Sequence, residues 1–185
     1  MGQEKDREQL KQILKKVSVR RGEEFVLASG KRSNVYVDAR LTTLRAEAMP
    51  LIGRLFLAKM AERGWQPAAV GGLTMGADPV AAAIARESLE AGPVMNAFIV
   101  RKQTKSHGLQ RRIEGIAGEG PLDVVVVEDV ATTGGSAAKA IEACREAGWT
   151  VLGAICLVDR EEGAAERIEQ EMHCPFDRIF RLREL

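Results

Sequence analysis

The sequence predicts an α/β fold in which a central parallel sheet is flanked by helices on both faces. Strand-like and helix-like segments alternate along the chain, a pattern typical of βαβ units. The run Val124–Val127 consists of four consecutive β-branched residues, which indicates a strand buried on both faces. The chain has 185 residues, of which 45% are hydrophobic and 29% charged, enough for one domain with a proper core.

The first part of the chain predicts a helix, two short strands, a second helix and a third strand. Apolar residues recur at helical spacing near the N-terminus, at Leu10, Ile13, Leu14 and Val17. Strands are expected at Phe25–Leu27 and Val35–Ala39, on either side of a polar turn. A helix is expected over Leu51–Arg63, where Pro50 is tolerated near the first turn, and a strand over Ala68–Gly71.

The middle of the chain predicts a helix followed by a strand. Asp78 is expected as the N-cap and Pro79 as the first helical residue of a helix over Val80–Glu90. Val94–Val100 is expected to form the strand that leads into a basic segment.

After the β-branched run, the sequence predicts one more helix and two strands. A helical stripe ends at Gly148, and its apolar members are Ala137, Ala140, Ile141 and Cys144. Strands are expected at Val151–Val158 and Asp177–Leu182. Ligands of parallel sheets bind beyond the carboxyl ends of the strands. One shared rim is therefore expected for the loops after Gly71, Val100, Val127 and Val158.

Charge is balanced over the whole chain but concentrated in one segment. Lys plus Arg total 27 against 26 Asp plus Glu. This balance argues against a protein that binds nucleic acid over its whole surface. Five basic residues and His107 occur without an acid in one short stretch, at Arg101, Lys102, Lys105, Arg111 and Arg112. Such a cluster indicates contact with a polyanion at one place, and a solvated loop is the alternative.

The sequence shows no sign of a membrane span, a secretion signal or a disulfide framework. No apolar stretch approaches the roughly 20 residues that cross a bilayer, and the N-terminus is charged throughout. Cys144, Cys156 and Cys174 form no CxxC pair, and the first two fall in apolar patterns typical of the core. We therefore expect a cytoplasmic protein without membrane contact.

Two carboxylates and a loop of small residues follow the β-branched run. Glu128 and Asp129 stand at the tip of the strand, where two acids are costly unless they meet a cation or hydroxyl donors. Thr132–Ser136 offers hydroxyls and backbone N–H groups at a helix start, which favours a phosphate. This pairing suits a ligand with both a diol and a phosphate, such as ribose 5-phosphate. The alternative is a capped turn beside two solvated acids.

Two common phosphate-binding motifs are absent from the sequence. It contains neither GxxxxGKS nor GxxxxGKT, and it contains no GxGxxG. Gly71, Gly72 and Gly76 come closest to the second motif, but their spacing is wrong. The sequence therefore indicates a sugar-phosphate loop of another kind.

The run VVVVEDVATTGGSA resembles the phosphoribosyl pyrophosphate motif of type I phosphoribosyltransferases. The segments SGKRSNVYVDAR, GGLTMGADPVAAAIA and FIVRKQTKSHGLQRRIEG narrow the resemblance to the orotate phosphoribosyltransferases, from about Phe25 to Arg160. The resemblance implies a type I phosphoribosyltransferase fold with a small N-terminal hood. A single domain, residues 1–185, would comprise the N-terminal helix and hood at about 1–45, a core at about 46–185 and a mobile loop at about 102–117.

The resemblance also implies a reaction, a metal and an assembly. Orotate and 5-phosphoribosyl 1-pyrophosphate would give orotidine 5′-monophosphate and pyrophosphate, a step of UMP biosynthesis, with Mg²⁺ required. The Mg²⁺ would be held mainly through the substrate, with Glu128 or Asp129 as the protein groups within reach. The enzyme would be a homodimer whose mobile loop reaches the neighbouring subunit's site, and it would bind no nucleic acid.

Site roles carried over by the resemblance fall into three groups. Glu128 and Asp129 would hold the ribose hydroxyls, and the 5-phosphate would be wrapped by Val130, Ala131, Thr132, Thr133, Gly134, Gly135 and Ser136. Orotate would contact Thr132, Arg160 and the backbone of Tyr36 and Val37. The pyrophosphate would be gripped by Arg101, Lys102, Lys105 and His107. Lys105 and His107, together with Asp129, would be the catalytic residues, since positive groups stabilise the charge that builds on a leaving group.

Two positions depart from the family pattern. Many relatives carry a lysine where Ala28 and Met75 stand, and those lysines contact the phosphoribosyl pyrophosphate; Lys31 or Arg32 is available here as a replacement. Two other functions stay open, a purine-type phosphoribosyltransferase and a regulator that keeps the fold as a nucleotide-sensing module. The chain outside the basic segment is net acidic, which disfavours a nucleic-acid-binding regulator.

Four other residues are expected to be structural. His173 stands next to a cysteine without partners at metal-ligand spacing. Trp65 and Trp149 each adjoin a glycine and are expected to cover the ends of elements. Asp159 is expected to orient Arg160 rather than to act as a base.

Overall fold

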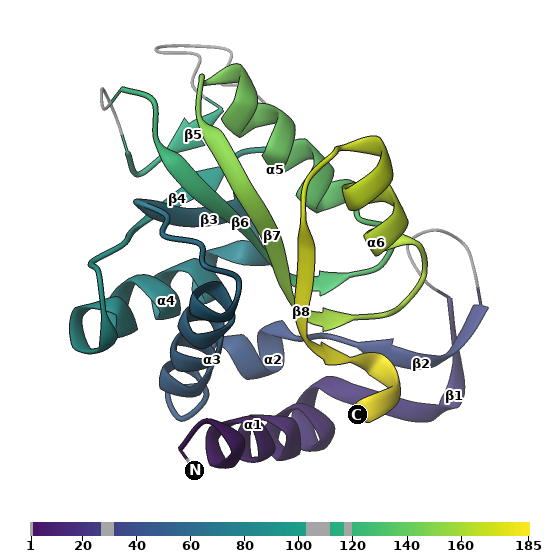
Figure 1. Ribbon diagram of the computed structural model, residues 1–185. Coiled ribbons are helices and arrows are strands. Elements are labelled where there is room, and N and C mark those ends of the chain that lie inside the picture. The colour runs from purple at the N-terminus through teal and green to yellow at the C-terminus, as the bar shows by residue number, and fades with distance from the viewer. Residues whose placement is uncertain (1, 27–31, 103–111, 117–119) are drawn as a thin grey trace.

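The computed structural model describes residues 2–26, 32–102, 112–116 and 120–185. The strands of its main sheet are β3 Ala69–Leu73, β4 Asn96–Val100, β5 Ile113–Glu114, β6 Asp123–Ala131, β7 Thr150–Asp159 and β8 Phe176–Arg181. Their order in the sheet is β5-β4-β3-β6-β7-β8 (Figure 1). β5 is antiparallel to β4, and all other neighbours are parallel. The predicted α/β class with a central parallel sheet is confirmed.

Helices cover both faces of this sheet (Figure 1). On one face lie α3 (Met49–Glu62) and α4 (Ala77–Ala91), and α1 (Gly2–Ile13) packs on α3. On the other face lies α5 (Gly135–Glu146), with the short α6 (Ala164–Glu166) nearby. Each face has its own cluster of buried apolar side chains, so the sheet is the middle layer of three.

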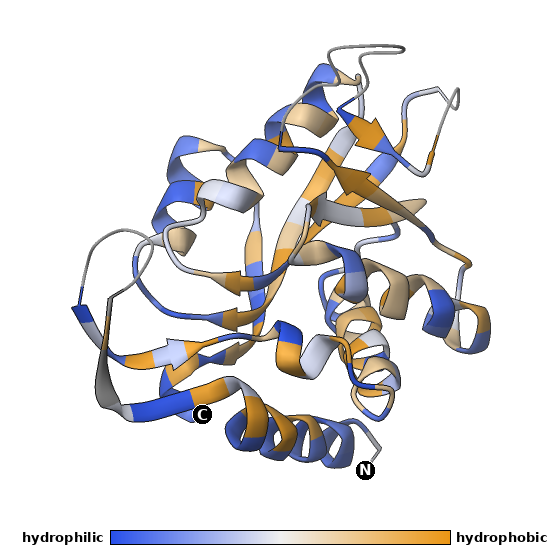
Figure 2. Ribbon diagram, turned by 180° about the vertical axis from the view of Figure 1, so that it is seen from behind, coloured by the Kyte–Doolittle hydropathy of each residue, from blue (hydrophilic) through white to orange (hydrophobic). Residues whose placement is uncertain are grey.

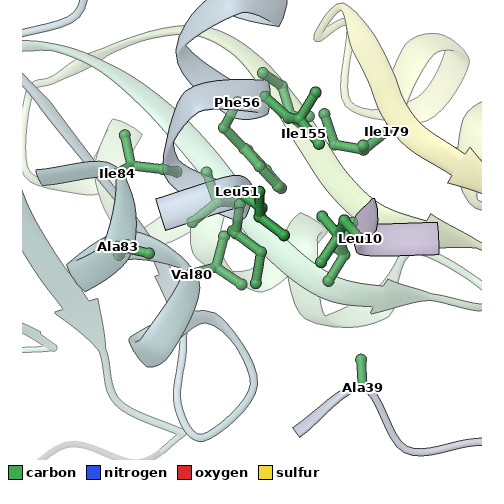
Figure 3. Packing of buried hydrophobic residues seen from close by; sticks show 14 of the residues in the cluster. Leu10, Ala39, Leu51, Phe56, Val80, Ala83, Ile84, Ile155 and Ile179 are labelled. Atoms are coloured by element: carbon green, nitrogen blue, oxygen red, sulfur yellow. The ribbon is translucent and has the colours of Figure 1, made fainter. Parts of the chain in front are cut away.

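One of these clusters fills the space between the sheet and α1, α3 and α4. Leu51 and Phe56 of α3 and Val80 and Ile84 of α4 belong to it, together with Ile155 of β7 (Figure 3). The strands at the centre are mostly apolar, while the helices alternate between polar and apolar residues (Figure 2). Each fully buried side chain of this kind stabilises the fold by about 1.5–3 kcal/mol.

The N-terminal segment forms a separate two-stranded antiparallel sheet. Its elements are the π-helical turn η1 Leu14–Ser18, β1 Val19–Val26, β2 Arg32–Val37 and the short helix α2 Arg40–Thr43. The buried hydroxyls of Ser18 and Thr42 form a hydrogen bond of 2.6 Å, which joins the end of η1 to α2. The predicted pair of strands is confirmed, although β1 begins earlier than expected. Both strands fall in the segment expected as the hood, and the division into hood and core stays a prediction.

The start of α4 differs from the prediction. Gly76 is its N-cap, and Asp78 lies inside the first turn. The Asp78 carboxylate instead accepts a hydrogen bond of 3.0 Å from the hydroxyl of Thr74, in the preceding turn. The assignment of Asp78 as N-cap is therefore wrong, because this carboxylate is engaged by a side chain rather than by the helix backbone. Its place in the first turn still suits the positive end of the helix.

β6 extends beyond the β-branched run as far as Ala131. It keeps its parallel pairing with β7 there, with Glu128 opposite Cys156 and Val130 opposite Val158. The expectation that the loop begins at Glu128 is therefore wrong: both acids are strand residues, and the loop begins after Ala131.

Two glycines allow β3 to lie between its neighbours. A Cβ atom on Gly71 would come within 2.2 Å of the carbonyl oxygen of Phe98 in β4. A Cβ atom on Gly72 would come within 2.1 Å of the carbonyl oxygen of Val127 in β6. A larger residue at Gly71 would push β3 away from β4, and one at Gly72 would push it away from β6, the strand that carries the two acids.

The elements that the sequence did not predict are all short. They are α2, β5, α6 with its π-helical continuation η2 Arg167–Glu171, and the final turn η3 Leu182–Glu184. Such short elements have too few residues to show a hydrophobic period. No helix in the described part of the chain is long and apolar enough to cross a membrane.

Candidate active site

A cavity of about 240 Å³ lies where the N-terminal segment meets the carboxyl ends of β3 and β6. Its lining consists of Val37, Asp38, Ala39, Arg40, Leu73, Thr74, Met75, Gly76, Lys102, Val127, Glu128, Asp129, Val130, Ser136 and Ala137. The expected shared rim is thus confirmed for the segments after β3, β4 and β6, which all reach this cavity. The loop after β7 does not line it.

Among the acids that line this cavity, Glu128 has the pKa that departs most from its usual value. Its carboxylate accepts hydrogen bonds from the hydroxyl of Ser136 and the backbone N–H of Ala137, at the start of α5. Its Oε2 atom is buried and has no hydrogen-bond partner among the described residues. Burial, followed by the charge of Asp129, raises the pKa of Glu128 to about 8. An unpartnered acceptor in a cavity is ready for a ligand that donates a hydrogen bond.

Asp129 lies beside Glu128 and faces the turn after β3. Its Oδ1 accepts a hydrogen bond of 2.9 Å from the N–H of Val130. Burial raises the pKa of Asp129, and this hydrogen bond and the charge of Arg40 oppose the rise. Arg40 itself forms an ion pair of 2.9 Å with Asp38. The cavity therefore combines two buried acids with a cation at its edge.

The predicted phosphate loop connects β6 to α5. Gly134 has a φ of +74°, and a Cβ atom there would lie 3.2 Å from the backbone of Ala164. The first backbone bond within the helix runs from the N–H of Ala138 to the carbonyl of Gly134. The N–H groups before Ala138 have no acceptor within the helix, and that of Ala137 is taken by Glu128. Thr132–Gly135 adjoins the cavity along the chain without lining it.

The turn after β3 also lines the cavity, through Thr74, Met75 and Gly76. The N–H of Thr74 donates to the carbonyl of Val100 at 2.9 Å, and the peptide bond between Thr74 and Met75 is cis. Met75, one of the two positions that depart from the pattern implied by the resemblance, is 65% exposed. This turn therefore offers backbone and hydroxyl groups but no cation.

Part of the basic segment can be placed. Lys102 lines the cavity, whereas Arg101 forms an ion pair of 3.3 Å with Glu114 and does not line it. Lys105 and His107 lie outside the described residues. Ala28 and Lys31 also lie outside them, whereas Arg32, the other expected replacement, is an exposed residue of β2 that does not line the cavity.

The pyrimidine side of the predicted site is placed only in part. Val37 lines the cavity, but Tyr36 does not; its ring packs against that of Phe25 at 5.5 Å. Arg160 donates to Glu162 at 2.8 Å and to the hydroxyl of Ser33 at 3.4 Å. Arg160 thus connects the loop after β7 to β2 without lining the cavity.

The expected contact between Asp159 and Arg160 is wrong. The Asp159 carboxylate, in a residue only 1% exposed, forms an ion pair of 2.9 Å with Arg178. It also accepts the backbone N–H of Glu161 at 2.8 Å. Arg160 follows the last residue of β7, and its side chain turns to Glu162 and to Ser33 of β2, whereas Asp159 turns to Arg178 of β8.

Trp65, Trp149 and the three cysteines are packed or buried, whereas His173 is exposed. Trp65 lies against Gly153, and the ring of Trp149 meets that of Phe98 at 5.3 Å. The three cysteines are buried and free, and burial raises the pKa of each thiol. Within the described ranges, no three His, Cys, Asp or Glu side chains gather as a metal site.

The sequence interpretation gave no role to several residues of the cavity. These are Asp38, Ala39, Arg40, Leu73, Thr74, Gly76, Val127 and Ala137. Most of them stand within the segments SGKRSNVYVDAR and GGLTMGADPVAAAIA. The sequence therefore pointed to these residues only through the resemblance of each whole segment to the family. No charge pattern or periodicity marks these positions individually.

Comparison with known proteins supports one family. A family model described as "Phosphoribosyl transferase domain" matches residues 44–177. The chain is 46% identical over 182 residues to orotate phosphoribosyltransferase of Aquifex aeolicus, covering 97% of each chain. It is 51% identical over 150 residues to that of Streptomyces avermitilis, covering 81% of each.

A similar solved structure is Mycobacterium tuberculosis orotate phosphoribosyltransferase in complex with 5-phospho-alpha-D-ribosyl 1-diphosphate. Its TM-score is 0.79 at 40% identity, with 97% of this chain and 98% of that chain covered. The sheet, its helices and the N-terminal segment are therefore features of a known fold.

Proposed function

The chain belongs to the phosphoribosyltransferase family, within its orotate phosphoribosyltransferases, and from this premise we propose how its cavity performs the reaction. In that reaction the bond from ribose C1 to the pyrophosphate oxygen breaks, and a bond from C1 to a ring nitrogen of orotate forms. The products are orotidine 5′-monophosphate and pyrophosphate. Positive charge develops on the sugar and negative charge on the leaving group.

One observation carries the proposal: Glu128 and Asp129 both line the cavity, and Oε2 of Glu128 is buried without a hydrogen-bond partner among the described residues. A buried acceptor of this kind needs a donor, and the two ribose hydroxyls supply donors at adjacent positions. The carboxylate of Asp129 next to the sugar also stabilises the positive charge that develops on it. We assign the pair to the ribose.

The 5-phosphate is assigned to the segment Val130–Ser136. The start of α5 supports this assignment, because the first N–H groups of the helix have no acceptor within it and lie at its positive end. Gly135 leaves room for a phosphate to approach the backbone, since a Cβ atom there would meet no described residue nearer than Arg167, at 3.5 Å.

The pyrophosphate is assigned to the turn after β3 and to the basic segment that begins at Arg101. Lys102 and Arg40 are cations in the cavity lining that can meet its oxygens. When bound, Mg²⁺ supplies further positive charge at those oxygens. The residues fit such an ion held mainly through the substrate, with Glu128 or Asp129 in reach, because the unpartnered Oε2 is a hard oxygen ligand. Lys105 and His107 are proposed to join them as the loop closes and excludes water.

Orotate is assigned to the space between β2 and the loop after β7. Arg160 is held there between Glu162 and Ser33, and a guanidinium matches a planar carboxylate by paired hydrogen bonds. The backbone of Tyr36 and Val37 and the hydroxyl of Thr132 are proposed to meet the ring. This assignment gives the enzyme a positive group for an acceptor base that carries a carboxylate.

The working unit is proposed to be a homodimer that shares its mobile loop between subunits and acts in the cytoplasm. Large apolar side chains are exposed at Met75, which lines the cavity, and at Leu41 and Leu44, which follow the lining residue Arg40 along the chain. Large exposed apolar side chains favour a protein interface. An interface there would place a partner subunit next to the pyrophosphate side of the site.

A panel of acceptor bases tests the proposed function. The purified chain is incubated with phosphoribosyl pyrophosphate and Mg²⁺ and with orotate, adenine or hypoxanthine in turn. We expect loss of orotate absorbance and formation of orotidine 5′-monophosphate, with no product from the purines. A purine nucleotide as the main product would favour the purine-type alternative, and binding of the sugar without turnover of any base would favour the regulator.

A further inference from the structure

We propose that Glu162 is a positioning residue that holds the guanidinium of Arg160 in the orientation that recognises the acceptor base. This inference rests on the proposed function, in which Arg160 meets the carboxylate of orotate. Glu162 does not line the cavity and is not assigned to any substrate.

Arg160 is an unusually enclosed cation. Its side chain is only 6% exposed, and it forms an ion pair of 2.8 Å from Nε to Oε1 of Glu162. Glu162 is the one carboxylate within ion-pair distance of Arg160 among the described residues. A buried guanidinium without such a partner would lose charge compensation and move toward water. Glu162 therefore fixes where Arg160 sits.

A second contact fixes the direction in which Arg160 points. Its Nη2 donates to the hydroxyl oxygen of Ser33 at 3.4 Å. That hydroxyl is itself held, because it donates to the carbonyl of Val35 at 2.9 Å and accepts the N–H of Val35 at 3.2 Å. Arg160 is thus stretched between the loop after β7 and a fixed group on β2.

These two contacts leave one edge of the guanidinium for a ligand. Nε–H is taken by Glu162, and Nη1 has no hydrogen-bond partner among the described residues. Nη1 and Nη2 together form the pair of donors that a carboxylate accepts in a bidentate way. Glu162 binds the side of the guanidinium that this geometry does not use, so it can orient Arg160 without competing for the substrate.

The neighbouring acid provides a matched contrast. Glu161 turns the other way, toward Arg181 at 3.7 Å and Arg183 at 3.5 Å near the C-terminus. It has the same charge, lies in the same loop and makes no ion pair with Arg160. The proposed role therefore depends on geometry rather than on negative charge near the loop.

Steady-state kinetics on four variants tests the inference: Glu162→Ala, Glu162→Gln, Glu161→Ala and Arg160→Ala. We expect Glu162→Ala to raise KM for orotate about tenfold, the usual effect of losing a hydrogen bond to a charged group. KM for phosphoribosyl pyrophosphate should stay unchanged. Glu162→Gln should restore most of the orotate affinity, since its amide oxygen still accepts the Nε–H of Arg160. Glu161→Ala should behave as the unmodified chain.

The outcomes separate this inference from the proposed function. If Arg160→Ala raises KM for orotate and Glu162→Ala does not, the positioning role is overturned and the role of Arg160 stands. If Arg160→Ala leaves KM for orotate unchanged, the assignment of orotate to Arg160 fails, and the positioning role fails with it. A Glu162→Ala variant in which both KM values rise equally would show a general structural role and would overturn the proposal. Glu162→Leu, which keeps most of the size of the side chain but cannot accept the Nε–H of Arg160, provides the same comparison if Glu162→Ala does not fold.

Discussion

Gly76, at the start of α4, lies directly against the carboxylate of Asp129 in β6. A Cβ atom on Gly76 would come within 2.3 Å of Oδ1 and 2.8 Å of Cγ of Asp129. The backbone at Gly76 has an ordinary φ of −83°, so the glycine is needed for space and not for its conformation. The contact joins the turn assigned to pyrophosphate to an acid assigned to ribose.

Gly76→Ala is expected to weaken binding of phosphoribosyl pyrophosphate while the protein stays folded. The added methyl must displace either Asp129 or the turn, and displacement of a charged contact typically costs about 2–5 kcal/mol of binding free energy. Titration calorimetry with phosphoribosyl pyrophosphate measures this directly. Gly92→Ala is the matched control, because a Cβ atom there meets nothing within 4 Å. Equal affinity in both variants would show that the contact between Gly76 and Asp129 does not matter for the ligand.

Glu128→Gln is expected to change how stability depends on pH. The pKa of Glu128 is raised to about 8 by burial, well above the 4.5 that is usual for this group. Between these two values the folded protein keeps a proton that the unfolded chain has released. The free energy of unfolding therefore falls as pH rises through this range, and the loss is complete above the folded pKa.

Glutamine cannot ionise, so the variant escapes that loss. Its Tm should exceed that of the unmodified chain at about pH 9, by about 2–4 °C for each kcal/mol gained, and the difference should shrink toward about pH 5. Thermal melts followed by circular dichroism measure this. Glu90→Gln, at a position 66% exposed on its side chain, controls for the loss of a carboxylate. A Tm difference that does not grow with pH would contradict the raised pKa.

Much of the fold could be predicted because its signals are local. The β-branched run, the helical stripe before Gly148 and the pairing of polar turns with apolar segments identify the sheet and its long helices. The end of β6 could not be predicted, because two acids look like the start of a loop and only pairing with β7 keeps them in a strand. Asp78 was misassigned for a similar reason, since its partner, Thr74, depends on how the turn folds.

The site was predictable where one segment carries its own chemistry. The acid pair and the glycine-rich loop are contiguous: the acids line one cavity with Lys102 and Val37, and the loop adjoins that cavity along the chain. The partners of Arg160 and Asp159 could not be predicted, because Ser33 and Arg178 come from distant parts of the chain. A carboxylate beside an arginine in sequence is a poor guide to the pair that forms in space.

Mixing two inactive variants tests whether the loop is shared between subunits. Lys105→Ala and Asp129→Asn are each expected to lose most activity, Lys105→Ala mainly in kcat because its charge acts as the pyrophosphate departs. Unfolding and refolding them together lets subunits pair at random, so that about half of the dimers are mixed. Each mixed dimer would have one intact site, and recovery of roughly a quarter of the original activity is expected.

The controls are each variant refolded alone and the unmodified chain refolded in the same way. A loop that serves its own subunit cannot generate an intact site in any pairing. A mixture as inactive as its parents would therefore contradict the shared loop, while leaving the assignment of the cavity untouched.

The affinity of Asp129→Asn for phosphoribosyl pyrophosphate tests the central claim most directly. The whole assignment of the cavity rests on Glu128 and Asp129 as the groups that bind the ribose hydroxyls. Asp123→Asn is the matched control, because Asp123 lies exposed at the opposite end of the same strand. Calorimetry should show a loss of about 2–5 kcal/mol for Asp129→Asn, which is a Kd at least about 30-fold higher, and no change for Asp123→Asn. A folded Asp129→Asn protein that binds phosphoribosyl pyrophosphate as tightly as the unmodified chain would contradict the account.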